Sequence, residues 1–217
     1  MTALSINTDH GKLKATLHEP KYSSAALLLA HGAGADHTHV HMERLTKAFG
    51  EAGIATLRFN FPFKEQGRNR VDSKQVCMDC ICRATEVLQT KTDKPVFVGG
   101  HSFGGRMVTH AVAENLLSCN GLILCSFPLH PAGKKSTERA GHFGDINKPV
   151  LFLSGTRDAL ADAELLTSCV ENVASKKLHW LETADHSFKI LKRSRKNTVD
   201  VYDEAAGVAA AFVAESG

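Results

Sequence analysis

The sequence predicts an α/β fold, built on a mostly parallel, doubly wound sheet with helices on both faces. Short apolar runs rich in Val, Ile, Leu and Phe alternate with longer segments of helical periodicity, as expected for successive βαβ units. The composition is that of an ordinary globular protein, with 43% hydrophobic and 23% charged residues. No linker, repeat or low-complexity tract divides the chain, so we expect one domain over residues 1–217.

The expected strands are distributed along the whole chain. An amphipathic strand over residues 12–18 comes first, and a fully apolar strand over 25–30 follows it. Further apolar runs predict strands at 54–59, 96–99, 121–126, 150–154 and 177–182.

Segments of helical periodicity fill the intervals between these strands. Helices are expected at 40–51, 73–89, 104–117 and 161–174, and a final helix carries Val201, Ala205, Val208 and Phe212 on one stripe. Asp72 or Ser73 is the expected N-terminal cap of the second helix. Residues 127–147 leave room only for a loop and a short helix, so we expect no lid domain and an open site.

Charge and composition argue against several function classes. The formal net charge is only +3 and basic residues are scattered among acids, so no nucleic-acid partner is expected, and the basic run 189–196 is read as a solvated loop. No apolar stretch reaches the roughly 18 residues that a membrane span needs, and the first residues do not resemble a signal peptide. Six cysteines do not form a pattern typical of a secreted disulfide framework, so we expect a cytoplasmic protein.

The chemistry of the sequence centres on the segment Gly100-His101-Ser102-Phe103-Gly104. A nucleophilic serine needs a tight turn from which its Oγ projects, and the flanking glycines let backbones approach without a Cβ clash. The three fixed positions alone are a weak signal, but here they lie between an apolar strand and a helix. This context predicts a nucleophile elbow at Ser102; the alternative is a glycine-rich turn without chemistry.

Serine becomes an effective nucleophile when a histidine accepts its proton and an acid orients that histidine. Around a nucleophile elbow these residues follow in the chain order Ser, Asp or Glu, His. Asp158 and His186 each lie just past a predicted strand, at the sheet edge where ligands gather in parallel sheets. The competing acid, Asp185, adjoins His186 and would need an unusual backbone to reach it, so we predict Asp158.

Acyl transfer also needs N–H donors for the oxyanion that forms at the substrate carbonyl. One predicted donor is the N–H of Phe103, which follows the nucleophile and opens a helix. The other is expected in the small-residue loop that begins at His31, where the N–H of Ala33 is the first candidate and that of Gly34 the second. The alternative for this loop is a plain glycine turn.

Six segments resemble a family of small α/β-hydrolases, which includes uncharacterised bacterial hydrolases and the testis-expressed and NSL-complex hydrolase-like proteins of animals. The segments are LAHGAGA (29–35), LRFNFP (57–62), GGHSFGGR (99–106), PLHP (128–131), SGTRD (154–158) and DHSFK (185–189). The resemblance implies the α/β-hydrolase fold and supports Ser102, Asp158 and His186 as a triad. Dienelactone hydrolases are more distantly similar, but they use a cysteine where this chain has Ser102.

Four residues are predicted to contact substrate: His31, Phe61, His130 and Arg70. Phe61 alternates with two other phenylalanines, a pattern that fits either core packing or an apolar wall for an acyl group. Arg70 belongs to a set of loop cations that would favour an anionic substrate; the others are Arg68, Lys134 and Lys189.

These observations predict a serine hydrolase that cleaves an ester or similar acyl bond of a small molecule, without a metal or organic cofactor. Two alternatives stay open. One is a binding or scaffolding protein that keeps a hydrolase shell, and the other is acyl transfer or thioester hydrolysis by the same triad.

Two further clusters have non-catalytic interpretations. His37, His39 and His41 alternate in a loop that enters a helix, where solvated histidines are more common than the converging ligands of a metal site. Cys77 and Cys80 share a helix face while the nearby Cys82 points elsewhere, and no second ligand cluster accompanies them. We therefore expect buried thiols and no zinc site.

Overall fold

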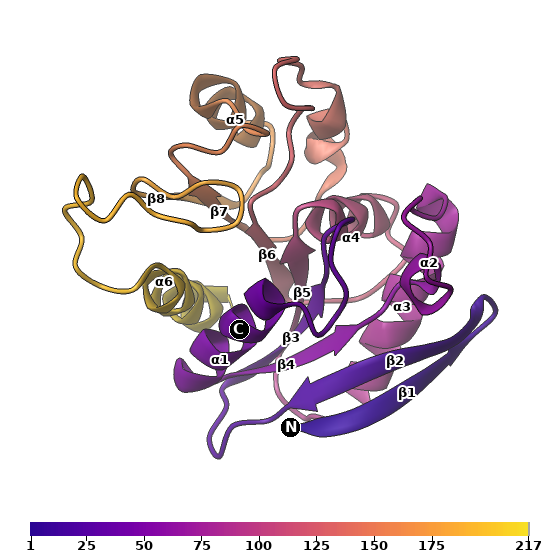
Figure 1. Ribbon diagram of the computed structural model, residues 1–217. Coiled ribbons are helices and arrows are strands. Elements are labelled where there is room, and N and C mark those ends of the chain that lie inside the picture. Colours follow the sequence, from indigo (N-terminus) through magenta and orange to yellow (C-terminus); the bar gives the residue numbers. More distant parts are fainter. Residues whose placement is uncertain (217) are drawn as a thin grey trace.

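The computed structural model describes residues 1–216, and its strands form a sheet in the order β1-β2-β4-β3-β5-β6-β7-β8 (Figure 1). Strands β3 to β8 run parallel, whereas β1 pairs with β2 and β2 with β4 in antiparallel register. The mostly parallel sheet that the sequence predicts is therefore confirmed. The strands are β1 Thr2–Thr8, β2 Gly11–His18, β3 Ala25–Ala30, β4 Ile54–Phe59, β5 Val96–His101, β6 Gly121–Cys125, β7 Val150–Gly155 and β8 Lys176–Leu181.

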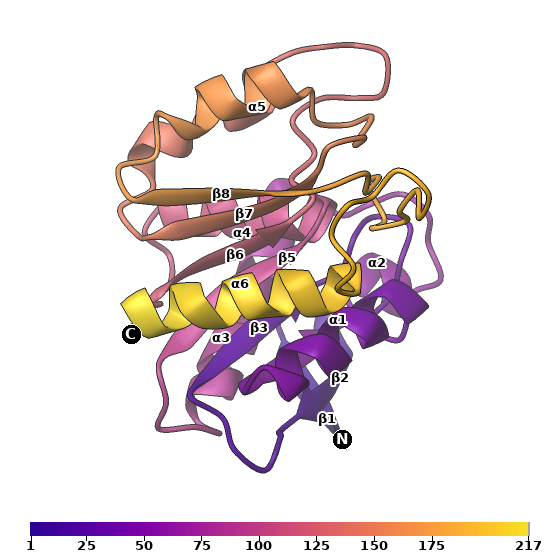
Figure 2. The same ribbon diagram turned by 90° about the vertical axis from the view of Figure 1, so that its left-hand side faces the viewer.

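Helices cover both faces of this sheet. Helices α1 and α6 pack together on one face, and α3 and α4 lie on the other, as Figure 2 shows from the α6 side. The helices are α1 Val40–Glu51, α2 Pro62–Glu65, α3 Lys74–Gln89, α4 Phe103–Ala113, α5 Ala163–Val170 and α6 Val201–Ser216. No helix among the described residues is both long and apolar enough to cross a membrane.

Strand β3 shows why its sequence is apolar without interruption. Ala26, Leu28 and Ala30 point into the apolar cluster beneath α3 and α4, while the alternate residues point into the cluster beneath α1 and α6. All six residues of β3 are buried because helices cover both faces of the sheet at this position. The carboxyl end of β3 is consequently fixed at the centre of the sheet edge.

The sequence interpretation missed β1 and the short helix α2. Strand β1 lies at the edge of the sheet, and Ile6 is its only fully buried residue, so its sequence carries little apolar signal. Helix α3 begins after Ser73, whose Oγ accepts the N–H of Val76 at 3.4 Å, as one of the two predicted caps. Helix α5 is shorter than predicted: it begins only after Asp162, which caps it by accepting the N–H of Leu165 at 3.1 Å, and it ends at Val170.

The connection between β6 and β7 contains only two short 3₁₀ helices in this part of the structure, at Glu138–Ala140 and Phe143–Asp145. The ring of Phe143 is buried against Phe127 and Phe152, which fixes this connection to the sheet. No lid domain is inserted at this point, as the sequence predicts.

Candidate active site

Ser102 lies between the end of β5 and the start of α4, with φ 52° and ψ −120°. The sharp turn brings the backbone against the end of β3. A Cβ at Gly100 or at Gly104 would lie only 2.6 or 2.5 Å from the carbonyl oxygen of Ala30. Glycine at both positions is therefore a packing requirement of the turn, which is the geometry of a nucleophile elbow.

Ser102, His186 and Asp158 form one hydrogen-bonded chain. The carboxylate of Asp158 can only accept, so Nδ1–H of His186 donates to its Oδ2 at 2.8 Å. The Nε2 atom on the other side of the ring then accepts a hydrogen bond from the hydroxyl of Ser102, with an Nε2–Oγ distance of 2.8 Å. The side chain of Asp158 is fully buried, while that of His186 is 21% exposed. This arrangement allows His186 to receive the proton of Ser102 while Asp158 fixes the orientation of the ring.

The two candidate acids have different roles in the structure. The second oxygen of Asp158 accepts the N–H of Leu160 at 2.8 Å. One carboxylate oxygen therefore fixes the side chain of Asp158, and the other binds the imidazole. Asp185 instead accepts the N–H groups of Ser187 and Lys189, at 2.8 and 3.0 Å. Asp185 therefore shapes the loop that carries the histidine, and Asp158 is the carboxylate that contacts the ring.

The loops that carry Asp158 and His186 are also bonded to one another. The backbone N–H of Arg157 donates to the carbonyl of Ala184 at 2.9 Å, and its guanidinium donates to the carbonyl of Thr183 at 3.1 Å. A Cβ at Gly155 would lie 2.3 Å from the same Ala184 carbonyl, so this close approach requires glycine. Asp158 and His186 are thus held on two loops that are hydrogen-bonded to each other.

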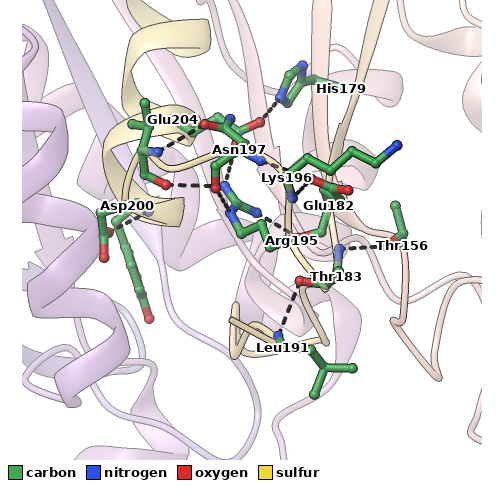
Figure 3. Close-up of polar contacts among 12 residues, drawn as sticks. Thr156, His179, Glu182, Thr183, Leu191, Arg195, Lys196, Asn197, Asp200 and Glu204 are labelled. Carbon is green, nitrogen blue, oxygen red and sulfur yellow. Dashed lines mark hydrogen bonds and ion pairs between the residues drawn. The ribbon is translucent and has the colours of Figure 1, made fainter. Parts of the chain in front are cut away.

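A buried arginine anchors the long segment between β8 and α6, which contains His186. The side chain of Arg195 is 2% exposed, and its guanidinium forms an ion pair with Glu204 of α6 and donates to the carbonyl of Glu182 at 2.6 Å (Figure 3). Glu204 also accepts a hydrogen bond from His179 of β8 at 2.8 Å. The basic run 189–196 was predicted to be a solvated loop; most of it is exposed, but the side chain of Arg195 is buried and has a structural role.

The predicted oxyanion donors are the N–H groups of Ala33 and Phe103. Within residues 1–216, neither group has a protein acceptor. The Phe103 N–H belongs to the first residue of α4, where the helix dipole adds positive potential. Ala33 is half-buried and Gly34 is exposed. The two follow Gly32, at which a Cβ would lie 3.6 Å from the Cβ of Ser102.

The loop that carries Ala33 is clamped by residues of the segment 57–62. Asn60 accepts both the backbone N–H and the Nδ1–H of His37 at 2.8 Å, and the buried guanidinium of Arg58 donates to the carbonyl of His37 at 2.6 Å. Sequence reasoning missed Arg58 and Asn60 as site-supporting residues. The available signal was their presence in LRFNFP, one of the segments of family resemblance.

Comparison with known proteins agrees with this geometry. Residues 23–214 match the family described as alpha/beta hydrolase domain. The chain belongs to this family. The finer resemblance, to the testis-expressed and NSL-complex hydrolase-like proteins, stays a prediction.

Solved structures share the fold of this α/β-hydrolase domain over nearly its whole length. They include a dienelactone hydrolase from Anabaena variabilis, with a TM-score of 0.77, 18% identity, and coverage of 99% of this chain and 97% of that one. A lidless α/β serine hydrolase from Xanthomonas campestris has a TM-score of 0.75, 19% identity and coverage of 99% and 93%. Est1E from Butyrivibrio proteoclasticus, with ferulic acid bound, has a TM-score of 0.75, 20% identity and 99% coverage of both chains.

Three of the four predicted substrate-contact residues lie in the interior of this α/β-hydrolase domain. His31 has no exposed surface; its Nδ1–H donates to the carbonyl of Gly32 at 2.8 Å, and its Nε2 accepts the N–H of Phe61 at 3.1 Å. Burial lowers the pKa of His31 to about 4, which keeps the ring neutral and both hydrogen bonds intact. His31 therefore holds the loop that carries Ala33 and does not offer a face to substrate.

The predictions that Phe61 and His130 contact substrate are corrected for the same reason, because both side chains are buried. The ring of Phe61 is fully buried and stacks on that of Phe63, with ring centroids 6.0 Å apart. Of the two interpretations of the alternating phenylalanines, the structure therefore favours core packing. His130 is 3% exposed, and it joins two loops by donating to the carbonyl of Pro131 and accepting the N–H of Asp162, at 2.9 and 3.0 Å. Sequence alone could not reveal these orientations because a residue next to a site can point into the core.

The four basic residues of the loops differ in their contacts. Arg70, Lys134 and Lys189 are exposed, whereas the guanidinium of Arg68 forms an ion pair with Asp72. A role of Arg70 in binding an anionic substrate stays a prediction.

The alternating histidines have separate partners. His37 is bound to Asn60, the Nδ1 atom of His39 caps α1 by accepting the N–H of His41, and His41 is hydrogen-bonded to the hydroxyl of Tyr202 at 2.7 Å. Among residues 1–216, no three His, Cys, Asp or Glu side chains are grouped as metal ligands.

The cysteines of α3 behave as apolar side chains. Cys77 and Cys80 are buried and Cys82 is half-buried, which confirms the predicted division of this cluster between helix faces. Burial raises the pKa of the Cys77 and Cys80 thiols to about 12, so neither is a reactive thiolate near neutral pH.

Proposed function

We propose that this chain is a serine hydrolase that cleaves an ester or related acyl bond through an acyl-enzyme intermediate. The observation that carries the proposal is the hydrogen-bonded chain from Ser102 through His186 to the buried Asp158, at an elbow between β5 and α4. A serine hydroxyl 2.8 Å from an imidazole nitrogen is the arrangement that general-base activation requires.

The proposed reaction has two steps. In the first, Oγ of Ser102 attacks the substrate carbonyl carbon while its proton moves to Nε2 of His186, and the resulting oxyanion accepts the N–H groups of Ala33 and Phe103. The tetrahedral intermediate then expels the leaving group, which takes the proton from His186. In the second step, water attacks the acyl-enzyme with His186 again as base, and Ser102 is regenerated.

The substrate is proposed to be a small acyl compound that reaches the site without passing a lid. Thioester cleavage and transfer of the acyl group to an alcohol or amine would use the same residues. Analysis of the products formed with alternative acceptors separates these reactions. We further propose a reducing, cytoplasmic location, because the six cysteines are all unpaired thiols.

The test is hydrolysis of a panel of activated esters and thioesters, with a hydroxycinnamate ester included because the similar Est1E holds ferulic acid. Ser102→Ala is expected to lower turnover at least about 10³-fold. Ser126→Ala is the matched control, since Ser126 also has a positive φ at the end of a neighbouring strand but is fully buried. Folded wild-type protein that cleaves no member of the panel faster than Ser102→Ala would contradict the proposal.

A further inference from the structure

His101, the residue immediately before Ser102, connects the nucleophile strand to the loop of the proposed base. Its ring is buried at the end of β5, and its Nε2–H donates to the backbone carbonyl of His186 at 2.9 Å. Strands β6 and β7 separate β5 from β8, after which His186 follows, so this bond spans two intervening strands. Displacement of the His101 side chain would therefore affect the position of His186 directly.

The same imidazole also contacts the loop of the proposed oxyanion donor. A Cβ at Gly32 would lie 3.0 Å from Nδ1 of His101 and 3.6 Å from Cβ of Ser102. The ring of His101 is thus adjacent to three loops at once: the nucleophile turn, the loop of Ala33, and the loop of His186.

A pair of aromatic side chains, His41 and Tyr202, supports His101. The His41 ring packs edge-on against His101 with ring centroids 4.3 Å apart, and Nδ1 of His41 is hydrogen-bonded to the Tyr202 hydroxyl at 2.7 Å. That hydroxyl lies 3.5 Å from the carbonyl oxygen of Ser187, to which it donates. Two successive carbonyls of the base loop, those of residues 186 and 187, are therefore held by side chains from β5 and α6.

The electrostatics of this cluster suit a neighbour of a general base. Burial lowers the pKa of His101 to about 4 and that of His41 to about 2. Both rings are uncharged near neutral pH, so neither places a positive charge beside His186 when that residue receives the proton of Ser102.

We infer that His101 is a positioning residue, whose Nε2–H fixes the backbone of His186 so that the imidazole keeps its contacts with both Ser102 and Asp158. The inference rests on the proposed hydrolase function. It assigns to the first variable position of the Gly-x-Ser-x-Gly turn a role in aligning the base.

The test compares His101→Leu with His101→Gln, since a glutamine Nε2 can still donate to the His186 carbonyl. His101→Leu is expected to lower kcat by about 10- to 100-fold with little change in KM, because small displacements of a catalytic group cost turnover on that scale. His101→Gln is expected to recover most of the loss. The matched control is His110→Leu, which removes another partly buried imidazole, in α4, stacked on His142 at 3.8 Å, and should leave kcat unchanged.

A second readout does not depend on activity. Hydrogen exchange of the backbone amides of residues 184–190 should be faster in His101→Leu than in wild type, and close to wild type in His101→Gln. The inference is overturned if His101→Leu matches His110→Leu in both kcat and exchange, or if His101→Gln is no better than His101→Leu. A wild-type protein without hydrolase activity that still shows the exchange pattern would contradict the proposed function, while the ordering of the loop by His101 would stand.

Discussion

Ser102 has a backbone conformation that residues with a side chain rarely adopt, and such conformations cost about 1–3 kcal/mol. Hydrogen bonds on both sides hold it in place: its N–H donates to the carbonyl of Cys125, and its own carbonyl accepts the N–H of Arg106, each at 3.0 Å. The turn directs the hydroxyl toward His186, so the strained backbone is part of how Ser102 reaches its place in the proposed triad.

This strain predicts that Ser102→Gly is more stable than Ser102→Ala by about 1 kcal/mol, after the larger chain entropy of glycine is subtracted. Both variants lack the hydroxyl, so the comparison isolates the backbone. Urea unfolding of the two proteins measures the difference. An alanine variant as stable as the glycine variant would show that the turn is not strained.

The different contacts of Asp158 and Asp185 lead to a second prediction. Asp158→Asn is expected to lower kcat by about 10³- to 10⁴-fold, because an amide can donate to Nδ1 and favour the wrong imidazole tautomer. Asp185→Asn keeps an oxygen that can accept the N–H groups of Ser187 and Lys189, so its kcat should stay near that of wild type. The kinetics of the two variants on one ester decide the assignment, and a larger loss in Asp185→Asn would reverse it.

At the scale of elements, the chain order of strands and helices could be predicted because apolar runs and helical periodicity are local features. The placement of Ser102, Asp158 and His186 at one sheet edge followed from that order, since all three lie just past strands. The clamp between Asn60 and His37 could not be predicted in the same way, because it joins residues 23 positions apart through side-chain geometry. Burial of Phe61 likewise depends on the direction in which the chain turns after β4.

The clamp itself is testable. Asn60→Ala removes the acceptor of two donors from His37, so the loop that carries Ala33 should lose its fixed position and kcat should fall by about tenfold or more. Asn69→Ala is the matched control, because Asn69 is exposed in the loop before α3. Steady-state kinetics with thermal unfolding separates a local effect from global destabilisation; equal kcat values for the two variants would contradict the role of the clamp.

At the scale of the whole molecule, burial keeps several histidines uncharged. It lowers the pKa of His41 to about 2 and that of four others to about 4, namely His31, His101, His110 and His142. These rings remain neutral in the folded state over a pH range in which the unfolded chain binds protons, with an ordinary histidine pKa near 6.5. The free energy of unfolding therefore depends on pH through these buried histidines.

The sign of this linkage follows from the lowered pKa values. Below about pH 6.5 the unfolded state binds more protons than the folded state, so stability falls as the pH decreases toward about 4. Each fully buried ring can contribute up to about 1.4 kcal/mol per pH unit in this window. Urea midpoints at pH 7.5 and pH 5 should differ clearly, with the lower value at pH 5; equal midpoints would mean that the histidines are not held neutral by burial.

Covalent labelling distinguishes an activated Ser102 from an ordinary serine hydroxyl. A fluorophosphonate probe reacts with a serine whose proton a neighbouring base can accept. We expect a single adduct on the folded wild-type protein, mapped to Ser102 by mass spectrometry and absent from Ser102→Ala. Folded wild-type protein that forms no adduct, or forms it on a serine other than Ser102, would show that Ser102 is not the activated nucleophile.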